Sequence, residues 1–132
     1  MAASTLDLRL PARPESVAHA RRRVRELANG LGLSESRADD LRTVVSEACM
    51  NAAVHAYDGD SPGEFEVSAR PIDGEIEVTV SDRGSGIRPQ AAGRPSAGSL
   101  GILVMARLAE SLEIRTGPEG GTIVRLRLPA LD

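Results

Sequence analysis

Glu47 and Asn51, a carboxylate and a carboxamide four positions apart, are the first candidates for chemistry. They lie in a run whose apolar residues recur at three- and four-residue steps, which predicts a helix beginning near a Ser34 N-cap and continuing to Tyr57. Residues four apart stand over one another on a helix, so both groups flank the buried stripe. Such a pair is costly at the edge of a core unless it binds something, although an isolated pair of this kind is usually only solvated.

A second candidate is Asp82-x-Gly84-x-Gly86, which follows a predicted buried strand. Taken alone, this sequence is a common turn. At the end of a strand, however, the two glycines let the backbone approach a flat ligand closely. An ionised aspartate only accepts hydrogen bonds, so it can select an exocyclic amine such as adenine N6 and reject the oxygen that guanine presents there.

Two further motifs are suited to a nucleotide. Gly98-Ser99-Leu100-Gly101 opens a predicted helix, whose free N–H groups and positive dipole end favour phosphate oxygens. Gly120-Gly121-Thr122 leads into the last predicted strand and places a hydroxyl near the same pocket. Each motif is weak alone, whereas the order of all four along the chain is specific.

The elements that must position these residues follow from hydrophobic periodicity and turn residues. We expect an α/β (α+β) two-layer sandwich with a mixed, mainly antiparallel sheet and helices on one face. The expected elements are a strand at Leu6–Leu10, a helix from Pro14 that stops at Asn29-Gly30, the Ser34–Tyr57 helix, a hairpin with strands around Phe65–Ala69 and Ile76–Val80 that turns at Asp73-Gly74, a loop over Arg88–Gly98, a helix over Ser99–Ala109, and a final hairpin that turns at Gly117–Gly121.

Composition excludes several classes of function. The 132 residues fit one domain spanning residues 1–132, and the net charge of -3 gives no general attraction to nucleic acid. All sixteen basic residues are arginines, so the chain lacks the lysine that a Walker A loop, an ordinary protein kinase or a Schiff base needs. We expect a cytoplasmic protein, because there is no membrane-span-length apolar run, no secretion signal and only one cysteine, Cys49.

The first predicted helix carries a cluster of arginines on its outer face, at Arg21, Arg22, Arg23 and Arg25. Such a cluster usually serves only as a solubilising face. The alternative is a docking surface for an acidic partner.

The order of the four motifs resembles that of the GHKL (Bergerat-fold) ATPases, over nearly the whole chain. Within that superfamily, Ser46-Glu47-Ala48 through His55-Ala56-Tyr57 is most similar to the anti-sigma factor serine/threonine kinases. A histidine kinase would need a preceding dimerisation helix, and a gyrase-type enzyme a second domain. We expect neither, since this chain has no room for them.

The resemblance implies a role for each matching residue. Glu47 would be the general base, Asn51 would ligate Mg²⁺ between the phosphates, and Asp82 would bind the adenine of ATP or ADP. Residues that would shape the nucleotide pocket or its phosphate-binding lid are Gly84, Gly86, Gly98, Ser99, Gly101 and Thr122. The chain departs from the family at Ser99, where glycine is usual, and in the short Arg88–Gly98 loop, in which Arg94 is the central cation.

The implied function is a kinase that phosphorylates a STAS-type anti-anti-sigma protein and sequesters a sigma factor. Relatives of this kind form homodimers, and the candidate surfaces here are the first strand and the arginine-bearing helix. One alternative is a module that binds a nucleotide and captures a regulator without phosphoryl transfer. Another is a small α/β scaffold that binds no nucleotide.

Overall fold

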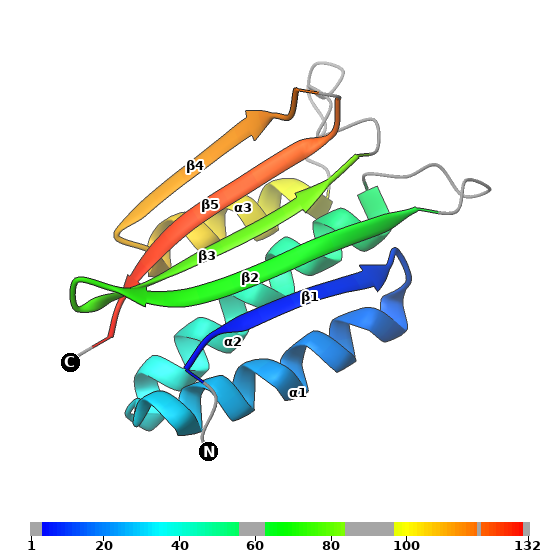
Figure 1. Cartoon of the computed structure of the whole chain (residues 1–132). Helices are drawn as coiled ribbons and strands as arrows, with labels where there is room; N and C mark the ends of the chain where they lie inside the picture. The colour runs from blue at the N-terminus through cyan, green and yellow to red at the C-terminus, as the bar shows by residue number, and fades with distance from the viewer. Residues whose placement is uncertain (1–3, 56–62, 84–96, 119, 131–132) are drawn as a thin grey trace.

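The structure is a computed structural model that describes residues 4–55, 63–83, 97–118 and 120–130. Five strands form one sheet in the order β1-β2-β3-β5-β4, and the helices cover one of its faces (Figure 1). The described elements are β1 (Leu6–Pro11), α1 (Pro14–Leu31), α2 (Glu35–Met50), η1 (Asn51–His55), β2 (Glu64–Ile72), β3 (Glu75–Asp82), α3 (Ala97–Leu108), β4 (Ser111–Thr116) and β5 (Thr122–Pro129). All four strand pairings are antiparallel, and the predicted two-layer α+β fold is confirmed.

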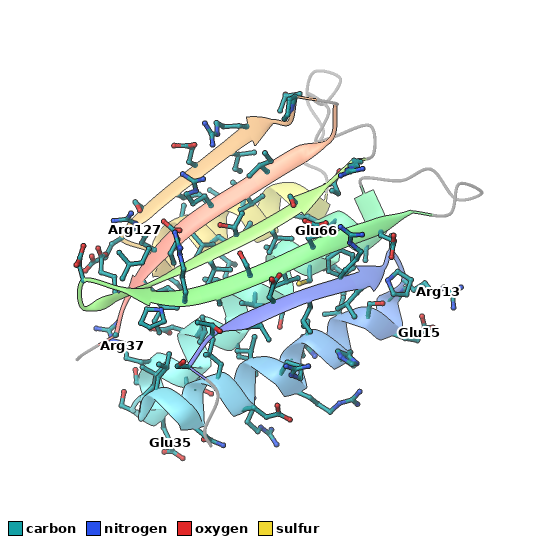
Figure 2. All side chains as sticks on the ribbon, viewed as in Figure 1. Arg13, Glu15, Glu35, Arg37, Glu66 and Arg127 are labelled. Carbon is teal, nitrogen blue, oxygen red and sulfur yellow. The ribbon has the colours of Figure 1, made fainter. Side chains whose placement is uncertain are left out.

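The core lies between the sheet and the helices because alternate strand residues point to opposite faces. In β1, the leucines at 6, 8 and 10 are buried while the residues between them are exposed. The opposite face of the sheet is polar, and Figure 2 shows Glu66 and Arg127 there. Ion pairs link neighbouring strands on this open face, including Arg9 with Glu66 at 2.6 Å and Arg127 with Glu77 at 3.3 Å.

The ends of α1 and α2 follow from local hydrogen bonding. The Ser34 side chain accepts a hydrogen bond from the Arg37 N–H at 3.2 Å, as the predicted N-cap requires. The predicted stop at Asn29-Gly30 is wrong, because α1 continues to Leu31. Gly32 ends the helix with a φ of 68°, a left-handed conformation that glycine adopts without a Cβ penalty.

The helix expected to run from Ser34 to Tyr57 changes its form before its end. Its α-helical part ends at Met50, and residues 51–55 form η1, a π-helix. Tyr57 lies outside the described residues. Periodicity did not predict this change, since short π segments within helices leave little trace in the hydrophobic pattern and occur frequently at functional sites.

The hairpin between β2 and β3 turns where the sequence predicted it. Asp73 and Gly74 have φ values of 48° and 80°, as a two-residue turn with positive φ at both positions requires. This turn fixes the register, in which Phe65 lies opposite Asp82 and Val67 opposite Val80.

None of the helices in the described ranges is long and apolar enough to cross a membrane.

Candidate functional site

Four element ends meet at one end of the molecule: the last turns of α2 with η1, the end of β3, the start of α3 and the start of β5 (Figure 1). Antiparallel pairing explains part of this meeting. Because β3 and β5 are neighbours, the end of β3 lies beside the beginning of β5, although 40 residues separate Asp82 from Thr122. Those predicted site residues that the structure describes lie on these ends: Glu47, Asn51, Asp82, Gly98, Ser99, Gly101 and Thr122.

Asp82 and Thr122 are joined directly. The Thr122 backbone N–H donates a hydrogen bond to Asp82 Oδ1 at 3.3 Å, and both residues are buried. Gly121 has a φ of 77°, and a Cβ at this position would overlap the carbonyl oxygen of Asp82. The Gly-Gly-Thr motif therefore allows β5 to begin directly against the end of β3. Glycine is needed at position 121 because a side chain there would overlap the β3 backbone.

Asn51 is the first residue of η1 and is buried, with 7% of its surface exposed. Its Nδ2 has no hydrogen-bond partner among the described residues. A buried amide nitrogen without a partner is unfavourable, so this group is suited to a ligand. Asn51 and Asp82 border one hollow of about 10 Å³, lined by Ala48, Asn51, Ala52, Val80, Asp82, Thr122 and Val124.

That hollow has room for about one water molecule and is far smaller than an adenine ring. It marks where the buried polar groups of η1, β3 and β5 meet, but does not give the outline of a nucleotide.

Glu47 lies one helical turn before Asn51 and is half-buried. The start of α3 packs against both residues at Gly101. A Cβ on Gly101 would lie 2.8 Å from Glu47 Oε2 and 3.7 Å from the amide atoms of Asn51. The absence of a side chain at 101 thus allows α3 to approach the carboxylate closely, and Asn51 borders both the hollow and α3.

A larger groove of about 510 Å³ lies between α1 and α2, and Glu47 is among the residues that line it. The Arg21 Nε donates a hydrogen bond to the Ser46 Oγ at 2.8 Å, and the Ser46 hydroxyl donates to the Arg42 carbonyl oxygen at 2.6 Å. Sequence reasoning identified the arginines of α1 and quoted Ser46 only within a motif, and it did not single out Arg42. Helical spacing places Ser46 and Arg42 one turn apart, but it did not show that Arg21 reaches them.

Several predicted residues lie outside the described residues or are described by their backbone alone. Gly84 and Gly86 lie outside the described residues, as does Arg94. Gly98 and Ser99 belong to the first turn of α3, where only the backbone is described. The site roles of these residues remain predictions.

Among the described residues there is no cluster of three histidine, cysteine, aspartate or glutamate side chains that could hold a metal. A single carboxamide still fits Mg²⁺, which prefers oxygen ligands and takes most of them from water and phosphates. The Asn51 carboxamide supplies one such oxygen, whereas its nitrogen, the atom that lacks a hydrogen-bond partner among the described residues, donates a hydrogen bond and is suited to a phosphate oxygen.

Cys49 lies on α2 between these groups in sequence but faces the core and is fully buried. Burial raises the pKa of its thiol to about 12. The thiol is therefore neutral at physiological pH and packs as a small apolar group, so it is no candidate nucleophile.

Comparison with known proteins adds a family to this geometry. A family model described as a histidine kinase-like ATPase domain matches residues 10–128. A serine-protein kinase RsbW from Bacillus licheniformis is 31% identical in an alignment that covers 95% of this chain and 85% of the relative. An anti-sigma F factor from Heyndrickxia coagulans is 33% identical in an alignment that covers 92% of this chain and 90% of the relative.

A solved structure supports the fold alone. The histidine kinase domain of the blue-light activated histidine kinase from Erythrobacter litoralis EL346 matches with a TM-score of 0.62 at 21% identity. The match covers 98% of this chain and 65% of that one.

Proposed function

Because this chain belongs to the histidine kinase-like ATPase domain family, we propose that it is an ATP-dependent serine/threonine kinase acting as an anti-sigma factor. The family resemblance read from the motifs is confirmed by the family match and by relatives named serine-protein kinase and anti-sigma F factor. The observation that carries the proposal is the meeting of Asn51, Asp82 and Thr122 around one hollow, with Glu47 beside Asn51.

In this proposal Asp82 recognises adenine. Its buried carboxylate accepts a hydrogen bond from the exocyclic amine of the base, and Thr122 supports it through the backbone hydrogen bond already described. Guanine presents an oxygen at the same place, which would face the carboxylate without a proton between them. The glycines at 84 and 86 complete the adenine side, and those at 98 and 101 lie with Ser99 on the phosphate side.

Glu47 acts as the general base. As the hydroxyl oxygen of a partner serine or threonine bonds to the γ-phosphorus, the Glu47 carboxylate takes the hydroxyl proton, and the bond from that phosphorus to the β,γ-bridging oxygen breaks to leave ADP. The Asn51 carboxamide oxygen would hold Mg²⁺, which would neutralise phosphate charge when bound. The partner is an anti-anti-sigma protein of the STAS type, and the sigma factor is the second binding partner.

The same proposal covers assembly and location. The protein forms a homodimer and acts in the cytoplasm, where a sigma factor is available. Neither nucleic acid nor a membrane is a partner, in keeping with the net charge of -3.

Two variants test the base and the adenine contact separately. Glu47→Ala should reduce phosphate transfer from ATP to a purified anti-anti-sigma partner by about 10²-fold or more, with ATP affinity nearly unchanged. Asp82→Asn should weaken ATP binding by about 1–3 kcal/mol in calorimetry and reduce the preference for ATP over GTP. Undiminished transfer in the Glu47 variant would remove the base assignment, while equal ATP and GTP affinities in the unmodified protein would remove the adenine assignment.

A nucleotide-binding module without phosphoryl transfer is the second candidate. It is favoured by one observation: Glu47 is not among the residues lining the hollow that Asn51 and Asp82 share. Co-purification of a sigma factor that depends on ATP, together with no phosphate on any partner, would support this alternative and exclude the kinase.

A further inference from the structure

The strand β4 forms one edge of the sheet, and within the described part of the chain β5 is its one neighbouring strand. Two large apolar side chains close to this edge are exposed: Ile114 of β4 at 37% and Leu103 of α3 at 60%. They are two of the three exposed large apolar side chains among the described residues. An edge strand with apolar side chains beside it is a template for a further strand.

Ile114 and Leu103 lie toward the same side of this edge. Ile114 pairs with Val124, which is buried against the helices, and directly paired residues share a face of the sheet. On α3, Gly101 faces Glu47 of α2, so Leu103, about 200° further around the helix, points away from α2. The helices follow one another across the sheet from the β1 side to the β4 side (Figure 1), so Leu103 is directed toward the β4 side.

The backbone of β4 also has hydrogen-bonding groups directed outward. Directly after this strand, the Gly117 N–H donates to the Gly121 carbonyl oxygen at 3.2 Å. Backbone groups alternate in direction along an antiparallel strand, so the odd-numbered residues of β4 face β5. The N–H and C=O groups of Leu112, Ile114 and Thr116 therefore point away from β5, where they can bond to another strand.

We infer that a second copy of this chain pairs with this edge, its own β4 lying antiparallel to the first with the two-fold axis at Ile114. The inference rests on the homodimer of the proposed function and names its surface. The pairing joins two sheets into one and covers Ile114 of each copy with Ile114 of the other. Leu112 lies opposite Thr116 of the second copy, so the outward backbone groups of the two edges match.

The charges on β4 favour this register. Glu113 and Arg115 are exposed on the open face and form an ion pair at 2.7 Å. In a pairing centred on Ile114, Glu113 of each copy lies opposite Arg115 of the other, which is an attractive cross-strand pair. A slip by two residues would place glutamate against glutamate or arginine against arginine. A slip by one residue would turn the helices of the second copy to the opposite face of the joined sheet.

The other edge of the sheet offers a second copy less. The leucines of β1 are buried in the core of their own chain, so pairing at β1 would remove no leucine side chain from water. Arg9 is already paired with Glu66 of β2 at 2.6 Å. The sequence suggested the first strand as a candidate dimer surface, whereas the exposed apolar side chains favour β4.

Charge reversal tests the pairing by sedimentation equilibrium. Glu113→Arg and Arg115→Glu each place like charges opposite one another in a homodimer, and each should weaken self-association by about tenfold or more. An equimolar mixture of the two variants should associate about as tightly as the unmodified protein, because opposite charges then face each other. Both variants lack the ion pair within the chain, so recovery on mixing reports contact between copies.

Asp7→Arg is the matched control, because it makes a charge reversal at an exposed residue of the opposite edge strand. It should leave self-association unchanged. Circular dichroism checks that every variant is folded.

Cysteine pairs test the register directly, with diamide as the oxidant. A mixture of Glu113→Cys and Arg115→Cys proteins should form a disulfide between copies, since directly opposite residues of this kind have Cα atoms about 4.5 Å apart. Either protein alone should not, because identical residues would then lie about 8 Å apart. Cys49 is buried and does not compete.

A protein that stays monomeric at every concentration would overturn the inference, as would a dimer that neither charge reversal weakens. An equal loss in Asp7→Arg, or no recovery on mixing, would also overturn it. Failure of the proposed kinase function is distinguishable, since it appears as a dimer that passes no phosphate from ATP to the anti-anti-sigma partner.

Discussion

Gly101→Ala tests the proposed base by moving it without removing it. The added methyl group would lie 2.8 Å from Glu47 Oε2, whereas ordinary contact begins near 3.4 Å, so the carboxylate must move by about 0.6 Å. The distances of 3.7 Å to the Asn51 amide atoms are ordinary contacts. The substitution therefore displaces Glu47 and leaves Asn51 in place.

The expected cost falls on the reaction and not on the fold. The carboxylate is the flexible end of a half-buried side chain, so it can move without a shift of the backbone. An alanine within α3 also favours the helix by up to about 1 kcal/mol relative to glycine. Because a misplacement of about 1 Å can cost 10²-fold in rate, we expect phosphate transfer to fall roughly tenfold.

The assay is single-turnover transfer from radiolabelled ATP to the anti-anti-sigma partner, with ATP affinity measured by calorimetry and stability by thermal unfolding. Gly30→Ala is the control, since it makes the same substitution in α1 away from Glu47. Transfer at the unmodified rate in Gly101→Ala, with unchanged stability, would refute the reasoning that Glu47 acts from its position beside α3. A matching loss in Gly30→Ala would refute it as well.

Two further predictions concern stability. Burial raises the pKa of the Cys49 thiol to about 12 in the folded protein. As the pH rises, the thiol therefore ionises first in the unfolded chain. The free energy of unfolding should fall above pH 9 by up to about 1.4 kcal/mol per pH unit. Urea unfolding from pH 7 to 10 measures this loss, which should be nearly absent in Cys49→Ala; equal losses in both proteins would contradict it. Ser34→Ala should lower the free energy of unfolding by about 1 kcal/mol, because α2 loses its N-cap, and it should leave ATP affinity unchanged. A urea unfolding midpoint equal to that of the unmodified protein would contradict the role of Ser34 as a cap.

The strands and most helix boundaries could be predicted because they depend on local patterns. The alternating leucines of β1, the Ser34 cap and the Asp73-Gly74 turn each act within a few residues. The end of α1 was misplaced because Asn29 and Gly30 tolerate a helical backbone there, and the left-handed position falls at Gly32 instead.

The candidate site was predictable in part for a different reason. Glu47, Asn51 and Asp82 were proposed from residue type and order, and the approach of Thr122 to Asp82 follows from the order of the strands. The contact of Gly101 with Glu47 and the bond from Arg21 to Ser46 depend on how helices pack. Packing of this kind joins residues far apart in sequence and leaves no spacing pattern to read.

The place of β5 between β3 and β4 has a consequence for synthesis of the protein. Asp82 meets the Thr122 N–H only after β5 has been inserted, so a growing chain that has left the ribosome only as far as β4 cannot yet form this hydrogen bond. The proposed nucleotide pocket is therefore complete only once β5 has left the ribosome and has been inserted between β3 and β4.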